Sequence, residues 1–167
     1  MDEGTYTDNV YAPTLVEWVQ NFGTRGSDDC QYILSDAEKS FIQENAALIE
    51  GKDLKGLEGK IDQSFNIERF KKNANSFSPA FVKIKNASII QINEYYEEPG
   101  QTVTFCLAYT EDYENVLSFY MFGDSGDAVE DSTVDIVLLP IDYTTYKNVS
   151  DESVWAVAGV AVKLDVK

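Results

Sequence analysis

The chain contains no histidine. Histidine is the general base that proteins use most often near neutral pH, and it is also their most common zinc ligand. Its absence excludes the Ser-His-Asp and Cys-His arrangements of nucleophilic catalysis. We therefore predict that the protein is not an enzyme, with no catalytic residue, no metal ligand and no cofactor.

Cysteine is scarce as well. Cys30 and Cys106 are too few for a structural zinc site or a disulfide framework. Cys106 lies in the apolar run FCLAY and is expected to be a small buried residue. If the protein is exported, Cys30 and Cys106 can form a disulfide bond, because oxidising compartments permit such bonds.

Positive charge is limited, since 13 lysines and arginines face 29 acids and the net charge is −16. Residues 1–78 hold 14 acids and 8 bases, and residues 79–167 hold 15 acids and 5 bases, so neither half offers a basic surface. Nucleic acid is bound through lysine and arginine. We therefore expect no nucleic-acid partner, and we interpret the acidic surface as a source of solubility rather than as a nucleic-acid mimic.

Long apolar runs are absent, because no segment approaches the roughly 20 apolar residues of a membrane helix. We therefore expect no transmembrane segment. Residues 1–13 have neither the basic start nor the apolar stretch of a signal peptide. The protein is then either cytoplasmic or exported with a leader that this sequence does not include, and a lipid anchor would likewise lie outside it.

The first half of the chain is predicted to be helical. Residues 1–13 are polar and aperiodic, which indicates a flexible lead-in, and residues 14–78 form the helical region. One helix is expected over about residues 14–22, with Thr14 as its cap. Its apolar positions fall on one face, and they are Leu15, Trp18, Val19 and Phe22.

A second helix carries clearer signals. Ser35 and Glu38 have the spacing of a capping box, and Gly51 is a typical helix stop. A third helical stretch covers about residues 66–74. Because such short helices form no core alone, we expect their apolar faces to pack on the second half of the chain. The apolar face of the second helix comprises Phe41, Ile42, Ala46, Leu48 and Ile49.

The second half, residues 79–167, changes to the two-residue period of strands. The alternation slips at Asn86, which indicates a β-bulge. Five antiparallel strands, the first long and bent, predict an α+β protein whose second half is a small closed OB-like (oligonucleotide/oligosaccharide-fold) β-barrel. The expected strands are 81–96, 101–109, 116–122, 133–140 and 154–164, with an acidic loop at 123–131 and a tyrosine-rich connection at 141–153.

Residues 66–164 resemble a known domain in several motifs. These are a helix at 67–70, a step at 73–77, the first strand at 81–92 (FVKIKNASIIQI), an acidic lead at 130–134, and Tyr143 and Tyr146 in the last connection. The pattern resembles the OB-type barrel domain of many uncharacterised exported proteins and lipoproteins of Gram-positive bacteria. The resemblance implies the fold and a place in the cell envelope, and it supplies no catalytic residue.

The chain departs from that pattern at three positions. Ala74 replaces the usual proline, Phe77 the usual tyrosine and Asn86 the usual glycine. Asparagine is the next best residue after glycine for the backbone angles of a bulge. The alternative fold is a helix packed on an open curved sheet, as in nuclear-transport-factor or cystatin-like proteins.

Candidate ligand-binding residues lie on the second and third strands. OB barrels bind single-stranded nucleic acid with basic grooves and stacked aromatic residues, but these two strands contain no lysine or arginine. The aromatic side chains could instead stack on a sugar or receive a partner protein, and ordinary packing is the competing interpretation. The candidates are Tyr109, Tyr113, Tyr120 and Phe122.

The acidic loop GDSGDAVED is rich in carboxylates without the ligand spacing of an EF-hand, so we interpret it as a solvated loop. Three functions remain. The favoured one is a non-enzymatic extracytoplasmic module that binds an unknown protein or small molecule. The alternatives are a structural spacer domain and a hydrolase that uses only aspartate and glutamate.

Overall fold

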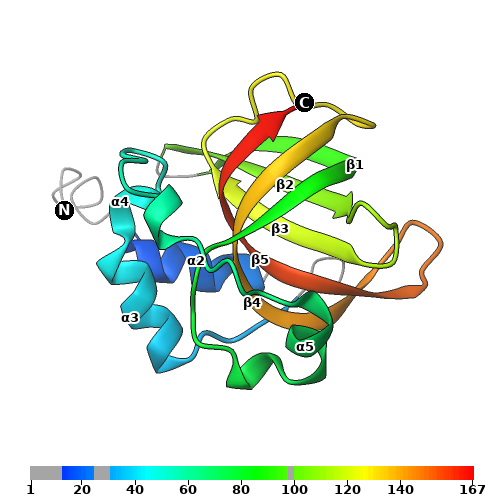
Figure 1. Ribbon diagram of the computed structural model, residues 1–167. Helices are drawn as coiled ribbons and strands as arrows, with labels where there is room; N and C mark the ends of the chain where they lie inside the picture. Colours follow the sequence, from blue (N-terminus) through cyan, green and yellow to red (C-terminus); the bar gives the residue numbers. More distant parts are fainter. Residues whose placement is uncertain (1–12, 25–30, 98–99) are drawn as a thin grey trace, which may run out of the picture.

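The computed structural model describes residues 13–24, 31–97 and 100–167, which form short helices followed by one closed sheet (Figure 1). The predicted lead-in lies almost wholly outside the described residues, as does Cys30. The helices are α2 (Leu15–Gly23), α3 (Asp36–Glu44), α4 (Ala46–Ile49) and α5 (Ile67–Lys72), with 3₁₀ turns at Glu58–Lys60 and Ala74–Ser76. The strands are β1 (Val82–Glu97), β2 (Gln101–Tyr109), β3 (Val116–Phe122), β4 (Thr133–Lys147) and β5 (Ser153–Val166).

Both predicted helix caps are confirmed. Thr14 Oγ1 accepts a hydrogen bond from the Glu17 N–H at 3.2 Å, and Glu17 closes a capping box. Ser35 and Glu38 form the second box, with the Ser35 N–H donating to Glu38 Oε1 at 2.8 Å. The second helix is interrupted at Asn45, whose side chain donates to the carbonyl of Phe41 in competition with the helix backbone.

The five strands form a sheet that closes on itself in the order β1-β2-β3-β5-β4. An open curved sheet is therefore not observed. The expectation of purely antiparallel strands is wrong, because β3 and β5 run parallel with Leu117 opposite Val157. The reason is topological: a closed ring with an odd number of strands cannot alternate in direction at every pair, so one pair must be parallel.

The predicted bulge in β1 is confirmed. Asn86 has φ of +56°, and the register with β4 shifts between Ile84 and Ala87. The Asn86 N–H donates to Asp135 Oδ1 on β4 at 3.0 Å. The bulge lets one long strand pair with β4 at its start and with β2 from Ser88 onward.

The expected connection at 141–153 is wrong over its first half. β4 continues past Pro140 to Lys147 and pairs with β5 as far as Ser153. Proline ends most central strands because it lacks an N–H, but here a register shift between Pro140 and Asp142 accommodates it. The extended β4–β5 hairpin projects from the ring (orange in Figure 1).

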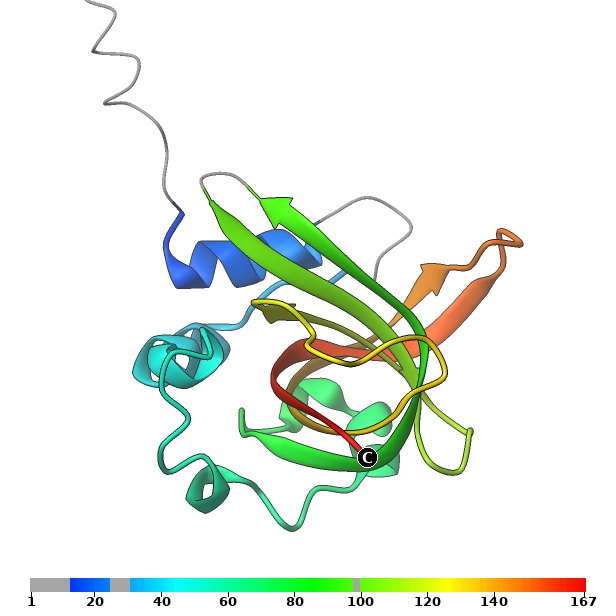
Figure 2. The ribbon, with the colours of Figure 1, turned by 90° about the horizontal axis from the view of Figure 1, so that it is seen from above.

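Two hydrophobic clusters use opposite faces of the sheet. One is formed by inward residues of all five strands and includes Phe119 and Leu138, with Phe70 of α5 at its edge. The other joins α2, α3 and α4 to the outer face of the sheet, as predicted for the apolar helix faces (Figure 2). Within the described residues, no helix has the length and apolar content needed to span a bilayer.

Candidate functional site

The four predicted aromatic residues separate into a covered pair and an exposed pair. Tyr120 and Phe122 lie beneath α2 and are 5 % and 8 % exposed. The ring of Phe22 stacks on Tyr120 with centroids 4.6 Å apart, and Trp18 meets Phe122 edge-on at 6.2 Å. The residue alternation of β3 could not predict that α2 covers Tyr120 and Phe122, because both faces of the strand carry apolar residues.

Tyr109 and Tyr113 are the exposed pair, at 38 % and 63 % of their surface, with ring centroids 5.4 Å apart. Tyr113 lies in the turn after β2 with φ of +60°, a conformation that is strained for a bulky side chain. Its hydroxyl lies 3.3 Å from Ser88 Oγ on β1. Strain of this kind tends to collect at functional sites.

A groove of about 490 Å³ lies between the outer face of β1 and β2 and the projecting β4–β5 hairpin. Tyr109 follows Leu107 by two residues and therefore lies on the same face of β2 as this groove, although neither Tyr109 nor Tyr113 lines it. We call it the outer groove. It is lined by Ile90, Gln91, Phe105, Leu107, Tyr146, Lys147, Asn148 and Val149.

The hairpin residues of the outer groove were not among the predicted site residues. On the sequence alone, Tyr146 and its neighbours are expected in a connection, where side chains have no defined face. In the structure Tyr146 pairs with Val154 and is 8 % exposed, whereas Val149 at the hairpin tip is fully exposed. The run of tyrosine and threonine at 143–146, two residue types that favour strands, was the available signal, and Pro140 obscured it.

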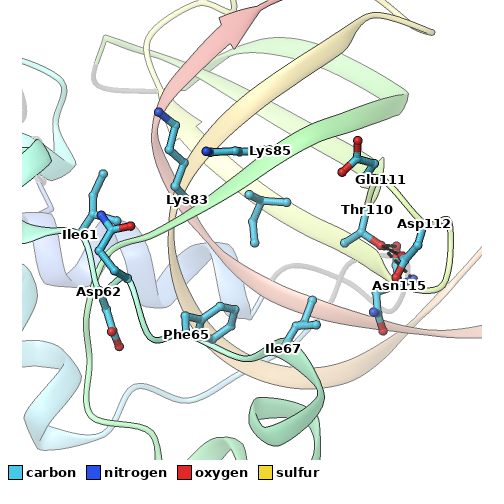
Figure 3. A pocket seen from close by; sticks show the side chains of 12 residues that line it. Ile61, Asp62, Phe65, Ile67, Lys83, Lys85, Thr110, Glu111, Asp112 and Asn115 are labelled. Atoms are coloured by element: carbon cyan, nitrogen blue, oxygen red, sulfur yellow. Dashed lines mark hydrogen bonds between the residues drawn. The ribbon is translucent and has the colours of Figure 1, made fainter.

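A second groove, of about 500 Å³, runs along the start of β1 (Figure 3). Lys83 and Lys85 project from β1, and Ile61 and Asp62 lie at one end of the groove. The other end is formed by Thr110, Glu111, Asp112 and Asn115. The partly buried side chains of Phe65, Ile67 and Ile84 supply an apolar floor. We call this the edge groove.

The acidic loop is anchored to β1 by one carboxylate. Glu94 accepts hydrogen bonds from the Ser125 hydroxyl at 2.6 Å and from the Ser125 N–H at 2.8 Å. The hydroxyl bond is the main reason that the pKa of Glu94 lies below its usual value, and the N–H bond adds to it. Among the described residues no group of three or more acids or cysteines could hold a metal ion.

Two carboxyl groups have a pKa above the usual value of their residue type. Burial raises the pKa of both Glu38 and Asp142, and both line a groove of about 450 Å³ beside α3. Glu38 already accepts the Ser35 N–H of its capping box. Asp142 accepts the N–H of Tyr143 at 2.8 Å.

Cys106 faces the interior of the ring and is fully buried. Burial raises the pKa of its thiol to about 12. A thiol that stays protonated is a poor nucleophile and a poor metal ligand. Cys106 is therefore a packing residue, as expected.

Comparison with known proteins supplies neither a family nor a function. No protein-family model matches the chain, and searches of curated proteins and of solved structures find no match. The function must be argued from the geometry of the grooves.

Proposed function

We propose that the chain is a non-enzymatic binding module whose ligand occupies the outer groove and stacks on Tyr109 and Tyr113. The exposed tyrosine pair carries the proposal. Two adjacent rings with one residue held at a strained backbone angle are costly to maintain unless the surface has a use. The outer groove, on the same face of β2 as Tyr109, provides the volume that a ligand needs.

The strand order supports the finer description of the fold as an OB-like barrel. OB folds are five-stranded barrels that bind ligands on the face of strands two and three, between the loops joining strands one and two and strands four and five. In this chain α2 covers one part of that face through Tyr120 and Phe122. The uncovered part, beside the β4–β5 hairpin, is the outer groove.

Apart from Lys147, the lining of the outer groove is uncharged, and we propose an oligosaccharide as its ligand. Aromatic faces stack on sugar rings, and the amides of Gln91 and Asn148 can exchange hydrogen bonds with hydroxyl groups. A polyanionic ligand would meet the repulsion of a chain with net charge −16.

The test is a thermal-shift screen of the full chain against neutral oligosaccharides, peptides and divalent ions. A ligand of the native state raises the melting temperature, and at 100 times its Kd it adds about 2.7 kcal/mol of stability. We expect an oligosaccharide to give the shift, and we expect the double variant Tyr109→Ala/Tyr113→Ala to lose it. Tyr96→Ala, which removes an exposed tyrosine near the far end of β1, is the matched control.

Other results of the screen would support the alternatives. If no compound shifts the melting temperature, the binding proposal is wrong and the spacer function is favoured. Hydrolysis of an oligosaccharide that is lost in Asp142→Asn would favour the acid-only hydrolase, because Glu38 and Asp142 share one groove and have raised pKa values. The existing bond of Glu38 to Ser35 makes this the weaker candidate.

We also propose that the module acts outside the cytoplasm, in the cell envelope. The support is the resemblance of residues 66–164 to barrel domains of exported proteins. Fractionation of cells that produce the complete protein, followed by detection with an antibody, tests the proposal. Recovery in the cytoplasmic fraction alone would contradict it.

A further inference from the structure

One backbone edge of β1 has no strand beside it. β1 pairs with β4 from Val82 and with β2 only from Ser88 onward. Just before β1, Phe81 forms a single parallel bridge with Ile61. Between that bridge and Ser88, the side of β1 that faces away from β4 has no strand neighbour among the described residues.

The hydrogen-bonding groups on this edge follow from strand geometry. The carbonyl of Phe81 accepts the Asp62 N–H at 2.8 Å and so points away from β4. Successive residues of a strand point their N–H and C=O groups to alternate sides. The N–H and C=O groups of Lys83 and Lys85 therefore face the edge groove, whereas those of Val82 and Ile84 face β4.

Local sequence explains why the parallel bridge ends after one residue. Asp62 Oδ1 accepts hydrogen bonds from the Ser64 N–H at 2.9 Å and from the Ser64 hydroxyl at 2.6 Å. This aspartate turn directs the chain away from β1. The diverging segment leaves the groove open along Lys83 and Lys85.

The charged side chains around the edge groove differ in the contacts that they make. Among the described residues, neither Lys83 nor Lys85 forms a salt bridge, and both are exposed. The acids at the groove ends accept hydrogen bonds from neutral groups. Glu111 accepts the side-chain amide of Asn86 at 3.0 Å, and Asp112 accepts the Thr110 hydroxyl at 2.7 Å. Lys83 also helps to lower the pKa of Asp135 on β4, and the two lysines are the positive charges beside the free edge of β1.

We propose that the edge groove binds an extended segment of a partner protein, which adds to the sheet as a further strand beside Lys83 and Lys85. The bound segment has an acidic residue, an aliphatic residue and a second acidic residue in succession. Its acids lie opposite the two lysines, because opposite charges stabilise cross-strand pairs. Its aliphatic side chain lies on the face of Ile84 and enters the apolar floor of Phe65 and Ile67.

The groove sets the length of the segment. The free edge spans residues 82–86, which at about 3.3 Å per residue is a run of about 16 Å. Strand addition of this kind derives affinity from main-chain hydrogen bonds and specificity from alternate side chains. The site shares no lining residue with the outer groove, so it stands independently of the oligosaccharide proposal.

The proposal is tested by NMR titration of the isotope-labelled full chain with a blocked peptide of sequence Gly-Ser-Glu-Ile-Glu-Ser-Gly. We expect saturable shifts confined to residues 81–87 and 110–115, and slower hydrogen exchange at the amides of Lys83 and Lys85. The same peptide methylated on the nitrogens of its three central residues is the control for main-chain bonding. A peptide with lysine in place of both glutamates is the control for charge.

The variant Lys83→Glu/Lys85→Glu keeps the backbone edge and reverses its charge. We expect it to bind the glutamate peptide about tenfold more weakly than the original chain and the lysine peptide more tightly. The proposal is overturned if the glutamate peptide gives no saturable shift at millimolar concentration, or gives shifts elsewhere. It is also overturned if the methylated peptide binds equally well, or if the double variant leaves both affinities unchanged.

Discussion

Asn86 and Tyr113 show how one unusual backbone angle can have two different origins. Both have positive φ, at +56° and +60°. Asn86 tolerates the angle well and serves the bulge that bends β1, so the slip in alternation made its position predictable. Tyr113 is unsuited to the angle, and no pattern in the sequence indicates it. Residue types that fit their backbone are predictable, whereas strained ones become visible only in the structure.

Glu94 gives a prediction about pH. Its pKa is lower in the folded protein because Ser125 donates two hydrogen bonds to the carboxylate. The resulting stabilisation is fully present above the unfolded pKa of about 4.3, and it is lost as the pH falls through the lower folded pKa. We expect Glu94→Gln to be less stable than the original chain at pH 7, with the difference closing below about pH 4.

Urea denaturation at several pH values measures this difference. Glu114→Gln, which neutralises an exposed acid in the β2–β3 turn, is the control and should change stability little at any pH. A Glu94→Gln deficit that is the same at pH 3 and pH 7 would show that charge does not underlie the contact.

Among the helices, α2 has a clear structural role. Phe22 is fully buried between α2 and β3, where its ring contacts both Tyr120 and Phe122. Removing such a ring from a packed site costs about 3 to 5 kcal/mol. We expect Phe22→Ala to lower the free energy of unfolding by this amount, measured by chemical denaturation.

The control for that measurement is Ile33→Ala. Ile33 also lies in the helical region but is 85 % exposed, so its truncation should cost little. If both variants unfold at the same denaturant concentration as the original chain, the helices do not stabilise the sheet. The predicted packing of the two halves would then contribute nothing to stability.

The helices and strands also show which structural features can be predicted from the sequence. Helix starts were predictable because Thr14, Ser35 and Glu38 act within one turn of chain. The extension of β4 was missed because Pro140 breaks the local pattern while its pairing with Gly159 lies far along the chain. The cover over Tyr120 was missed for the same reason, since its partner Phe22 is distant in sequence. Long-range pairing leaves no local trace.

For the whole molecule, the net charge of −16 opposes the approach of polyanions. We predict no measurable binding of single-stranded DNA or RNA at micromolar protein and physiological salt. Stacking on Tyr109 and Tyr113 would supply about 1–3 kcal/mol per base, and this must overcome both charge repulsion and the cost of association. Physiological salt reduces the repulsion without reversing it.

Fluorescence anisotropy of a labelled mixed-sequence oligonucleotide measures the binding. A flat titration is the expected result. A saturable rise that weakens with added salt would reveal a cationic groove and contradict the prediction.

The parallel pairing of β3 with β5 also has a consequence for how the protein reaches its native state. Leu117 meets Val157 across this pair, and Val82 meets Leu138 across the pairing of β1 with β4. Such non-local contacts require large loops to close first, so folding is expected to be slow for a chain of this size. Until β5 is inserted, β3 and β4 both keep an open edge that invites intermolecular pairing. During that interval we expect the mutual repulsion of strongly acidic chains to oppose the aggregation of half-closed rings.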